Sequence, residues 1–285
     1  MNAAVRLPDG LEASVGDGAE TTGTGDATYP TRRLQRGLVL LDRGQDLCEE
    51  GVGFGVPVLK RGLQTVFPGG MDLHVTAEEP DWRVTAVYRL DLVERLAARR
   101  GTVRARLVYA AKDSLAAVHR RVPALRRPLT ALSIALRRRL GLRTFYQPVG
   151  LVASVPVTYT VRGGESVVSI AVDLTGVPAS VTEVVLMNEL GAGHFDSYED
   201  SSGASLTGSA VGTWDEVTAA TASLVCSRRR IAFTLARVPG ARLMCGREAV
   251  AGRLSWAGFG YSVRPGAPSF AYDVRVGRRP GGGAA

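Results

Sequence analysis

Apolar and polar residues alternate with a period of two along most of this chain, and that pattern limits what it can fold into. The clearest stretch runs from Arg83 to Glu94. Its apolar residues would share one face of an extended segment: Val84, Ala86, Tyr88, Leu90 and Leu92. Successive side chains of a strand point to opposite faces. The alternation therefore predicts half-buried β-strands, which an amphipathic helix could not satisfy.

The same alternation recurs from Val155 to Val161, followed by the turn sequence RGGES and the run VVSIAVDL. A Gly-Gly turn between two alternating runs predicts a β-hairpin. Further segments also have the character of strands: 38–42, 52–59, 71–76, 102–109, 183–190, 205–213, 217–226, 230–236, 251–263 and 269–276. We expect about a dozen strands or more.

One segment, 113–140, interrupts this pattern with helix signals. Asp113 or Ser114 can cap a first short helix, Pro123 ends it, and Pro128 and Gly141 bracket a second. Because strands and helices do not alternate, a parallel sheet is excluded. We expect a mainly β fold, a large antiparallel sandwich of two sheets, with a short helical insertion at about 113–140.

In strand number and length, Gly37 to Gly277 resembles the super-sandwich architecture of galactose-mutarotase-like and polysaccharide-lyase domains, with no motif in common. The resemblance implies one large domain, 34–277. Residues 1–33 and 278–285 are rich in Gly, Ala and other small or polar residues and are expected to be flexible tails. The alternative is two smaller β domains divided near residue 112.

The positive charge of the chain is concentrated in one segment. The net charge is +8, and Arg99 to Arg143 holds 13 basic residues but one acid, Asp113. Arginines that flank a short apolar core could bind an anionic lipid, a polyanion or an acidic partner, with Arg137, Arg138 and Arg139 as anion-binding candidates. The alternative is a pair of amphipathic helices that cover a sheet edge. Nucleic acid is not favoured, because Tyr109 is the only aromatic residue in the segment.

Several other classes of protein are excluded or disfavoured. The three cysteines have no metal-ligand or disulfide-framework spacing. The first 15 residues lack the apolar run of a signal peptide, and the apolar stretch 128–136 is about half of a membrane span. The glycines in Glu49–Pro57 do not open a helix, which argues against a dinucleotide loop. We expect a cytoplasmic protein, peripheral to a membrane if the arginines dock there, with no metal and no cofactor.

One polar segment, Met187–Gly203, gathers groups that can bind sugar hydroxyls or transfer protons. Within it, His194 and Asp196 are two residues apart and would share one face of an extended strand. Asp72 and His74 have the same spacing elsewhere in the chain. From these patterns the candidate catalytic residues are His194, Asp196, His74 and Glu189, and the candidate ligand-binding residues are Glu49, Glu50, Asp72 and Tyr198. The structural alternative is a solvated loop rich in turn-forming residues.

Together these features favour a carbohydrate-related protein that binds or processes a sugar in a groove on a sheet face. The alternative is an interaction protein whose arginine-rich helices dock on an anionic surface. No motif decides whether the chain is an enzyme. The two hypotheses differ in what they require: a groove lined by Trp, Tyr and carboxylates for the first, and an exposed leucine stripe beside arginines for the second.

Overall fold

The computed structural model describes residues 2–16, 35–49, 51–62, 64–77, 81–96, 145–212, 214–250 and 254–279. The chain divides into two compact units. The first consists of Met1–Thr22, Arg33–Asp91 and Leu151–Ala285, and the second of Gly23–Arg32 and Leu92–Gly150. In the second unit the described residues are the ends of two long strands, β7 (Trp82–Leu96) and β8 (Phe145–Val161). All other strands of the described ranges belong to the first unit.

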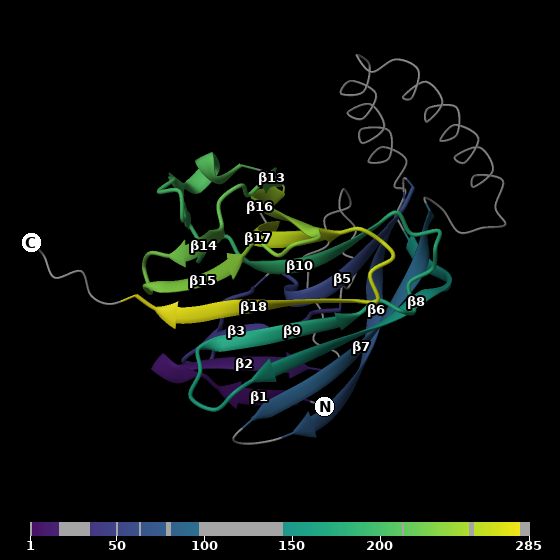
Figure 1. The fold of residues 1–285 in the computed structure, drawn as a ribbon, viewed down its shortest axis with the longest axis horizontal. Coiled ribbons are helices and arrows are strands. Elements are labelled where there is room, and N and C mark those ends of the chain that lie inside the picture. Colours follow the sequence, from purple (N-terminus) through teal and green to yellow (C-terminus); the bar gives the residue numbers. More distant parts are fainter. Residues whose placement is uncertain are drawn as a thin grey trace, which may run out of the picture. The chain divides into compact units, whose positions relative to one another are not determined.

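Most strands belong to one antiparallel sheet of 14 strands, in the order β12-β11-β14-β15-β18-β9-β8-β7-β6-β5-β10-β17-β16-β13 (Figure 1). Besides β7 and β8 these are β5 (Gly53–Arg61), β6 (Gln64–Ala77), β9 (Val167–Asp173), β10 (Glu183–Gly191), β11 (Ser197–Asp200), β12 (Ser205–Thr207), β13 (Asp215–Glu216), β14 (Thr221–Cys226), β15 (Ile231–Ala236), β16 (Ala241–Val250), β17 (Leu254–Val263) and β18 (Ser269–Arg278). The predicted mainly β, antiparallel fold class is confirmed.

The large sheet folds over at β6, so that its two halves face each other. Gln64–Val66 pair with β5, whereas Phe67 and the residues after it pair with β7. We call β5, β10, β17, β16 and β13 the β10 half, and β7, β8, β9, β18, β15, β14, β11 and β12 the β18 half. Phe233 of the β18 half touches Phe54 and Phe259 of the β10 half, with ring centroids 5.4 Å apart in both pairs. The fold is therefore a sandwich made by one continuous sheet.

Buried hydroxyl and amide groups also join the two halves. The Tyr159 hydroxyl of β8 donates to the Phe54 carbonyl of β5 at 3.0 Å, and the Tyr272 hydroxyl of β18 donates to Asn188 Oδ1 of β10 at 2.7 Å. Asn188 also accepts from the N–H of Gly55. A Cβ at Gly55, where φ is +74°, would lie 2.9 Å from the Tyr159 ring. A glycine is thus required where β5 packs against the Tyr159 ring of the β18 half.

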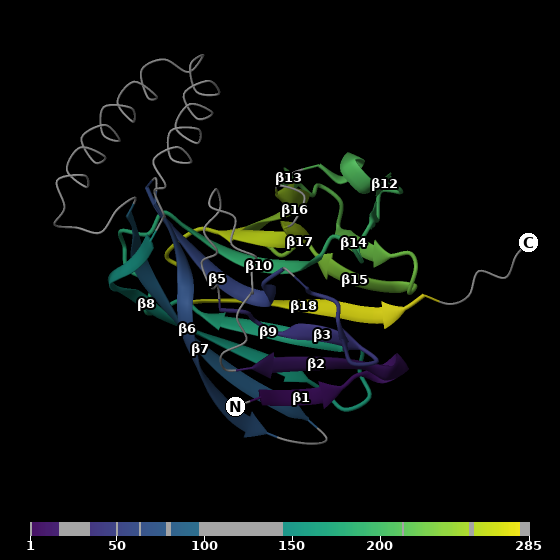
Figure 2. The same ribbon diagram turned by 180° about the vertical axis from the view of Figure 1, so that it is seen from behind.

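A second sheet has four antiparallel strands, β1 (Asn2–Arg6), β2 (Leu11–Gly16), β3 (Val39–Asp42) and β4 (Gln45–Asp46) (Figure 2). It is tied to β5 by hydrogen bonds in both directions between Leu38 and Phe54. The prediction of a flexible tail over 1–33 is wrong for residues 2–16. Leu11, Ala13 and Val15 are buried at alternate positions of β2, and small residues among them hid the pattern in the sequence.

Two other segments differ from their predicted structure. The sequence predicts one strand over 205–213, but β12 ends at Thr207 and a 3-10 helix follows at Gly208–Val211. A second 3-10 helix lies at Pro8–Gly10. The pattern also failed to indicate β16, because both Arg242 and Met244 lie on the same face of that strand. A charged and an apolar residue on one face obscure the alternation.

Some predictions fall on residues outside the described part. They include the strand at 102–109, the helical insertion at 113–140, the anion-binding candidates Arg137, Arg138 and Arg139, and Glu50. These stay predictions, as does docking on an anionic surface. Within the described ranges there is no helix with the length and apolar character needed to cross a bilayer.

Candidate ligand-binding site

The outer face of the β10 half carries side chains in rows that the strand register defines. Antiparallel partners point to the same face of a sheet. One row joins Val58 of β5, Val185 of β10, Ser262 of β17 and Arg242 of β16. The next row along the strands joins Val56, Met187, Gly260 and Met244. Lys60 pairs with Glu183 at the near end of β10. Apolar and charged residues therefore share one outer face.

These rows line a groove with two adjoining parts. The first part has a volume of about 340 Å³ and an apolar lining with a charged margin: Val58, Lys60, Thr65, Phe67, Glu183, Val185, Met187, Trp214, Arg242, Met244, Gly260 and Ser262. The second, of about 710 Å³, is more polar and open: Thr182, Glu183, Gly240, Ala241, Arg242, Ser262 and Arg264. Glu183, Arg242 and Ser262 line both parts. The two parts form one site with an apolar end and a charged end.

Trp214 makes the wall at the apolar end. A Cβ built on Gly260 would lie 3.0 Å from the Trp214 ring, so the indole lies directly over this glycine. The ring also packs against Trp256 of β17, with centroids 4.8 Å apart and planes tilted by 32°. The backbone of Trp214 has a φ of +57°, an uncommon conformation for a residue with a side chain. Such strain persists only where surrounding contacts hold it, which is frequent at ligand sites.

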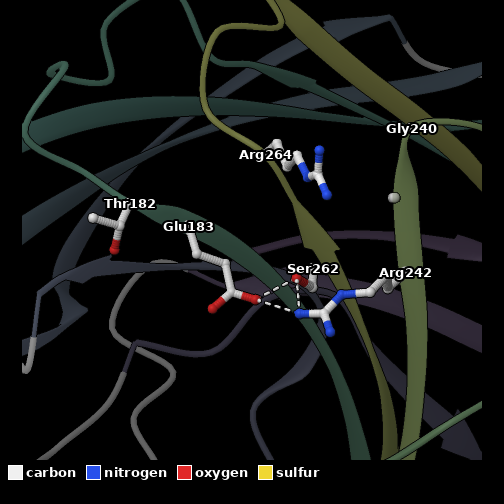
Figure 3. Close-up of a pocket in the computed structure, with 7 residues that line it drawn as sticks. Thr182, Glu183, Gly240, Arg242, Ser262 and Arg264 are labelled. Atoms are coloured by element: carbon white, nitrogen blue, oxygen red, sulfur yellow. Dashed lines mark hydrogen bonds and ion pairs between the residues drawn. The ribbon is translucent and has the colours of Figure 1, made fainter.

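The charged end is centred on the Glu183 carboxylate (Figure 3). Lys60 Nζ lies 2.7 Å from Oε2, and Arg242 Nη2 lies 3.4 Å from Oε1. The Ser262 hydroxyl donates to Oε1 as well, and Arg242 donates to Ser262 Oγ at 3.3 Å. Partial burial alone would raise the pKa of Glu183, but the hydrogen bonds from Lys60 and Ser262 and the two cationic charges outweigh it and lower the pKa. Glu183 is therefore ionised near neutral pH.

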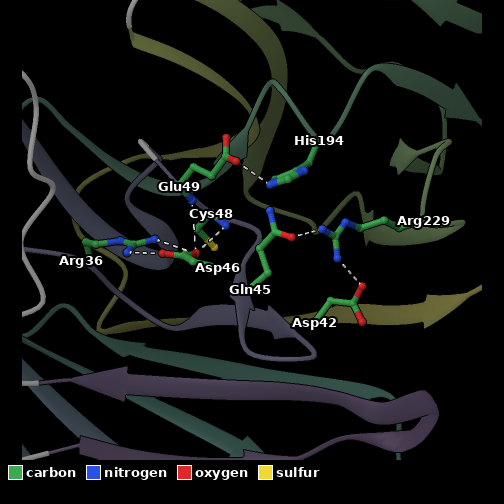
Figure 4. A network of polar contacts seen from close by, with 8 residues as sticks. All are labelled: Arg36, Asp42, Gln45, Asp46, Cys48, Glu49, His194 and Arg229. Carbon is green, nitrogen blue, oxygen red and sulfur yellow. Dashed lines mark hydrogen bonds and ion pairs between the residues drawn. The ribbon is translucent and has the colours of Figure 1, made fainter.

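A second polar cluster lies at the far end of β10, where the loop after β4 meets the turn after β10 (Figure 4). His194 Nε2 lies 2.6 Å from Glu49 Oε1. Glu49 has a φ of +44°, and its carboxylate lies over Gly191, at whose position a Cβ would be 2.7 Å from Oε2. Asp46 holds the loop by accepting the N–H groups of Cys48 and Glu49.

The structure brings three of the predicted residues to this loop. Glu49 and His194 contact each other, and Glu189 Oε2 accepts the N–H of Val52 at 3.4 Å. Glu189 is 8% exposed, so its carboxylate is largely withdrawn from solvent. Neither Glu189, Glu49 nor His194 lines the groove of the β10 half.

Asp196 and Tyr198 are held by their neighbours. Asp196 Oδ1 accepts from the backbone N–H and the hydroxyl of Ser227, at 3.2 and 2.9 Å. Burial would raise the pKa of Asp196, but these hydrogen bonds prevail and lower it. The Tyr198 hydroxyl donates to Asp200 Oδ2 at 2.8 Å. These contacts order the chain after β10, and a role of Asp196 and Tyr198 in a site stays a prediction.

Asp72 and His74 lie on the β18 half of the folded sheet, in the part of β6 that pairs with β7. His74 is exposed and pairs in register with Thr85, and Asp72 lies 3.8 Å from Arg89. No hydrogen bond or ion pair among the described residues joins either of them to Glu49 or His194. The structure therefore joins the two Asp–His pairs by no polar contact among the described residues, and a shared site stays a prediction.

The groove residues were missed by the sequence analysis. Trp214 follows a Gly-rich turn, and Lys60, Glu183 and Arg242 lie on three strands that are far apart in the chain. One sequence signal was available: the strand residues 184–187 and 257–261 are apolar or glycine at both parities. Such runs are typical of strands that are covered on both faces.

The chemistry open to this groove follows from its lining. Glu183 is the only carboxylate among the described lining residues, whereas a glycosidase of the usual type needs two. Across the described residues there is no group of three or more His, Cys, Asp or Glu arranged to hold a metal ion. The lining supplies a ring surface, an ionised carboxylate, hydroxyl groups and three cations, which are groups suited to binding.

Comparison with known proteins gives weak structural likenesses. No protein-family model and no curated protein matches the chain by sequence. The Slr1438 protein from Synechocystis sp. PCC 6803 aligns over 98% of this chain and 96% of its own, with TM-score 0.40 and 9% identity. The GH36 alpha-galactosidase AgaB from Geobacillus stearothermophilus aligns over 79% of this chain and 30% of its own (TM-score 0.36, 8% identity). A galactose mutarotase-like protein from Clostridium acetobutylicum aligns over 77% of this chain and 74% of its own, with TM-score 0.29 and 8% identity. Likenesses at these scores do not bear on what the chain binds.

Proposed function

We propose that this chain binds a sugar in the groove on the outer face of the β10 half, with Trp214 against the sugar ring. The observation that carries the proposal is the position of this indole. It forms one wall of a hollow whose other end holds the Lys60–Glu183–Arg242 cluster. A sugar ring has apolar C–H faces and a polar rim, and the groove offers a complement to each.

The apolar floor supports a ring-shaped ligand. Val185, Met187 and Met244 are half-buried in the free protein, so each still has surface to lose when a ring covers it. Removing that surface from water is worth about 25 cal/mol per Å². Methionine side chains adapt their shape to a ligand at low cost.

The charged end supports recognition of hydroxyl groups. Glu183 is ionised and accepts hydrogen bonds only, whereas Lys60 and Arg242 donate only. A sugar hydroxyl both donates and accepts, so it can bridge such a pair. Hydrogen bonds in which one partner carries a charge are about twice as strong as neutral ones.

Binding, rather than hydrolysis, is the part of the carbohydrate hypothesis that the groove supports. Its one carboxylate has a lowered pKa and is already engaged by cations, so it is a poor proton donor at neutral pH. The Glu49–His194 pair holds the better acid–base chemistry of the two clusters, but it does not line the groove. Its role as a catalytic pair stays a prediction.

The experiment is a calorimetric titration of the whole chain with the methyl glycosides of galactose, glucose and mannose, with cyclohexylmethanol as a ring that lacks the hydroxyl pattern. We expect at least one glycoside to bind and cyclohexylmethanol to bind more weakly. Equal or stronger binding of cyclohexylmethanol, or no binding of any glycoside at millimolar concentration, would overturn the proposal.

Variants then locate the ligand. Trp214→Ala should weaken glycoside binding by roughly tenfold or more, and Trp214→Phe by less, because a ring surface remains. The matched control is Leu206→Ala, since Leu206 is an exposed apolar residue of β12 that does not line the groove. Thermal unfolding of each variant checks the fold. Unchanged affinity in a folded Trp214→Ala protein would place the sugar elsewhere.

A further inference from the structure

The charges that line the groove do not balance. Lys60, Arg242 and Arg264 are cationic, and Glu183 is the only acid among the described lining residues. All four lie toward the Glu183 end of the groove, whereas Trp214 lies over Gly260, in the row of Met187. A groove end with two uncompensated positive charges attracts a negative group, and its partly apolar walls weaken the screening by water.

Glu183 is engaged on both of its oxygens. Oε2 is paired with Lys60 at 2.7 Å, and Oε1 is shared between the Ser262 hydroxyl and Arg242 at 3.4 Å. Arg242 contributes one nitrogen, Nη2, to both Glu183 and Ser262. Its side chain is 60% exposed, so its other N–H groups remain free to donate to a ligand.

Arg264 is the second available cation. It follows the last residue of β17, and its side chain points into the open part of the groove beside Arg242 (Figure 3). It makes no hydrogen bond or ion pair with any described residue. The guanidinium groups of Arg242 on β16 and of Arg264 just after β17 thus face the same space. Guanidinium matches a carboxylate or sulfate in planar, paired hydrogen bonds.

We propose that the groove selects a sugar that carries an anionic group, with the ring against Trp214 and the anion between Arg242 and Arg264. This inference rests on the proposed function and names its ligand class: a uronic acid or a sulfated sugar. Met187 in the apolar part lies four positions after Glu183 along β10, a distance of about 13 Å at the usual rise of a strand. That span has room for a sugar ring with its charged substituent, or for two linked rings.

The decisive comparison uses two probes that differ in one group. Methyl galactoside and methyl galacturonide share a ring, but the second has a carboxylate in place of the CH₂OH group. We expect the acid to bind at least about tenfold more tightly, because a charged hydrogen bond replaces a neutral one. The glucose and glucuronic acid pair repeats the comparison, and methyl galactoside 6-sulfate tests whether the anion is a sulfate instead.

Charge variants provide the second test. Arg264→Gln should remove most of the preference for the acid, because it should weaken binding of the acid much more than binding of the neutral glycoside. Arg264 makes no hydrogen bond or ion pair with a described residue, so the fold should not change. Arg242→Gln should also lower the preference for the acid, and it should weaken binding of the neutral glycoside as well, because Arg242 can donate to sugar hydroxyl groups. The control is Arg275→Gln, an exposed arginine on the outer face of the β18 half. Raising the salt from about 50 to about 500 mM should weaken binding of the acid and not of the neutral sugar.

The outcomes separate this inference from the proposed function. If neutral and acidic glycosides bind equally, the anion preference is wrong and the sugar site stands. If neither sugar binds, the proposed function itself is wrong. A preference for the acid that survives Arg264→Gln and is lost in Arg275→Gln would place the anion on the other face and overturn the proposed position between Arg242 and Arg264.

Discussion

The two halves of the folded sheet share a core but have unlike outer faces. On the β18 half, hydroxyl groups pair across neighbouring strands: Thr85 with Thr158 at 2.9 Å, Ser223 with Thr234 at 2.7 Å, and Ser169 with Asp273 at 2.7 Å. On the β10 half, the corresponding positions hold Val185, Met187 and Met244, with Trp214 above them.

The difference concerns what each face leaves unsatisfied. We call the outer face of the β18 half the hydroxyl face. It makes its hydrogen bonds within the sheet and to water, so a ligand would gain little there. The β10 half presents apolar surface beside charges that the protein only partly neutralises. An apolar patch rimmed by polar groups on an otherwise polar protein marks a binding surface. The proposed recognition therefore belongs to one face of the folded sheet and not to the other.

The largest effect should come from filling the groove. Gly260→Leu adds a side chain whose Cβ alone would lie 3.0 Å from the Trp214 ring, so the indole must move or the groove is occupied. Overpacking of this kind costs about 1–3 kcal/mol, and we expect glycoside affinity to fall by roughly tenfold to a hundredfold. Calorimetric titration measures the loss.

Its control on the other face is Ala271→Leu. Ala271 is exposed in the middle of β18 and pairs with Ala171, which is also exposed. The same added volume meets solvent there, so affinity and stability should stay near those of the parent protein. Equal losses of affinity in the two variants would contradict the contrast between the faces.

A smaller effect is expected from a polar group on the groove floor. Met187→Gln keeps the length of the side chain but puts an amide between Val58, Met244 and Trp214. Partial burial of an amide without a partner costs about 1–2 kcal/mol. Urea unfolding should show this loss, whereas Ala171→Gln on the hydroxyl face should change the free energy of unfolding by less than about 0.5 kcal/mol. A loss of the same size in both would show that the groove floor is as solvated as the hydroxyl face.

The contrast also explains what the sequence could predict. In β9 and β18 every second residue is buried and most of the others are exposed, so the period of two alone identifies the strands and their core face. The β10 half breaks this pattern: Val184 and Leu186 face the core, and Val185 and Met187 face the groove. The sequence could predict that β10 is a strand. It could not predict that the second set of apolar residues in β10 lines a groove.

The site itself depended on register, which a single sequence does not specify. Lys60, Glu183 and Arg242 meet because their strands pair in one alignment, and a slip by one residue would turn each side chain to the opposite face. The Glu49–His194 contact joins two loops more than a hundred residues apart. The polar composition of its segment made His194 a candidate catalytic residue, but only the fold shows that Glu49 lies beside it.

Acidification tests the charged margin of the groove and should have a modest effect. The pKa of Glu183 is lower in the folded protein than in the unfolded chain, so ionised Glu183 stabilises the fold above its unfolded pKa, and this contribution is lost as the pH falls through the lower folded value. For a partly exposed ion pair we expect about 1 kcal/mol or less.

Glu183→Gln isolates this contribution. The variant should lose stability at neutral pH and should converge with the parent protein at pH values below the folded pKa of Glu183, where the parent carboxyl is protonated. Denaturant unfolding from neutral to strongly acidic pH gives the difference. A difference that stays constant across this range would show that Glu183 acts through packing and not through its charge.

The smallest effect belongs to the hydroxyl face. Thr158→Val removes the hydrogen bond to Thr85 Oγ1 but leaves a β-branched residue that favours a strand, and Thr85 can bond to water instead because the position is half-exposed. We expect the free energy of unfolding to change by no more than about 0.5 kcal/mol and the affinity for glycosides not to change. Urea unfolding and titration on the same preparation check both. A loss of affinity with an intact fold would mean that the hydroxyl face takes part in binding, and the division of roles between the two faces would then be wrong.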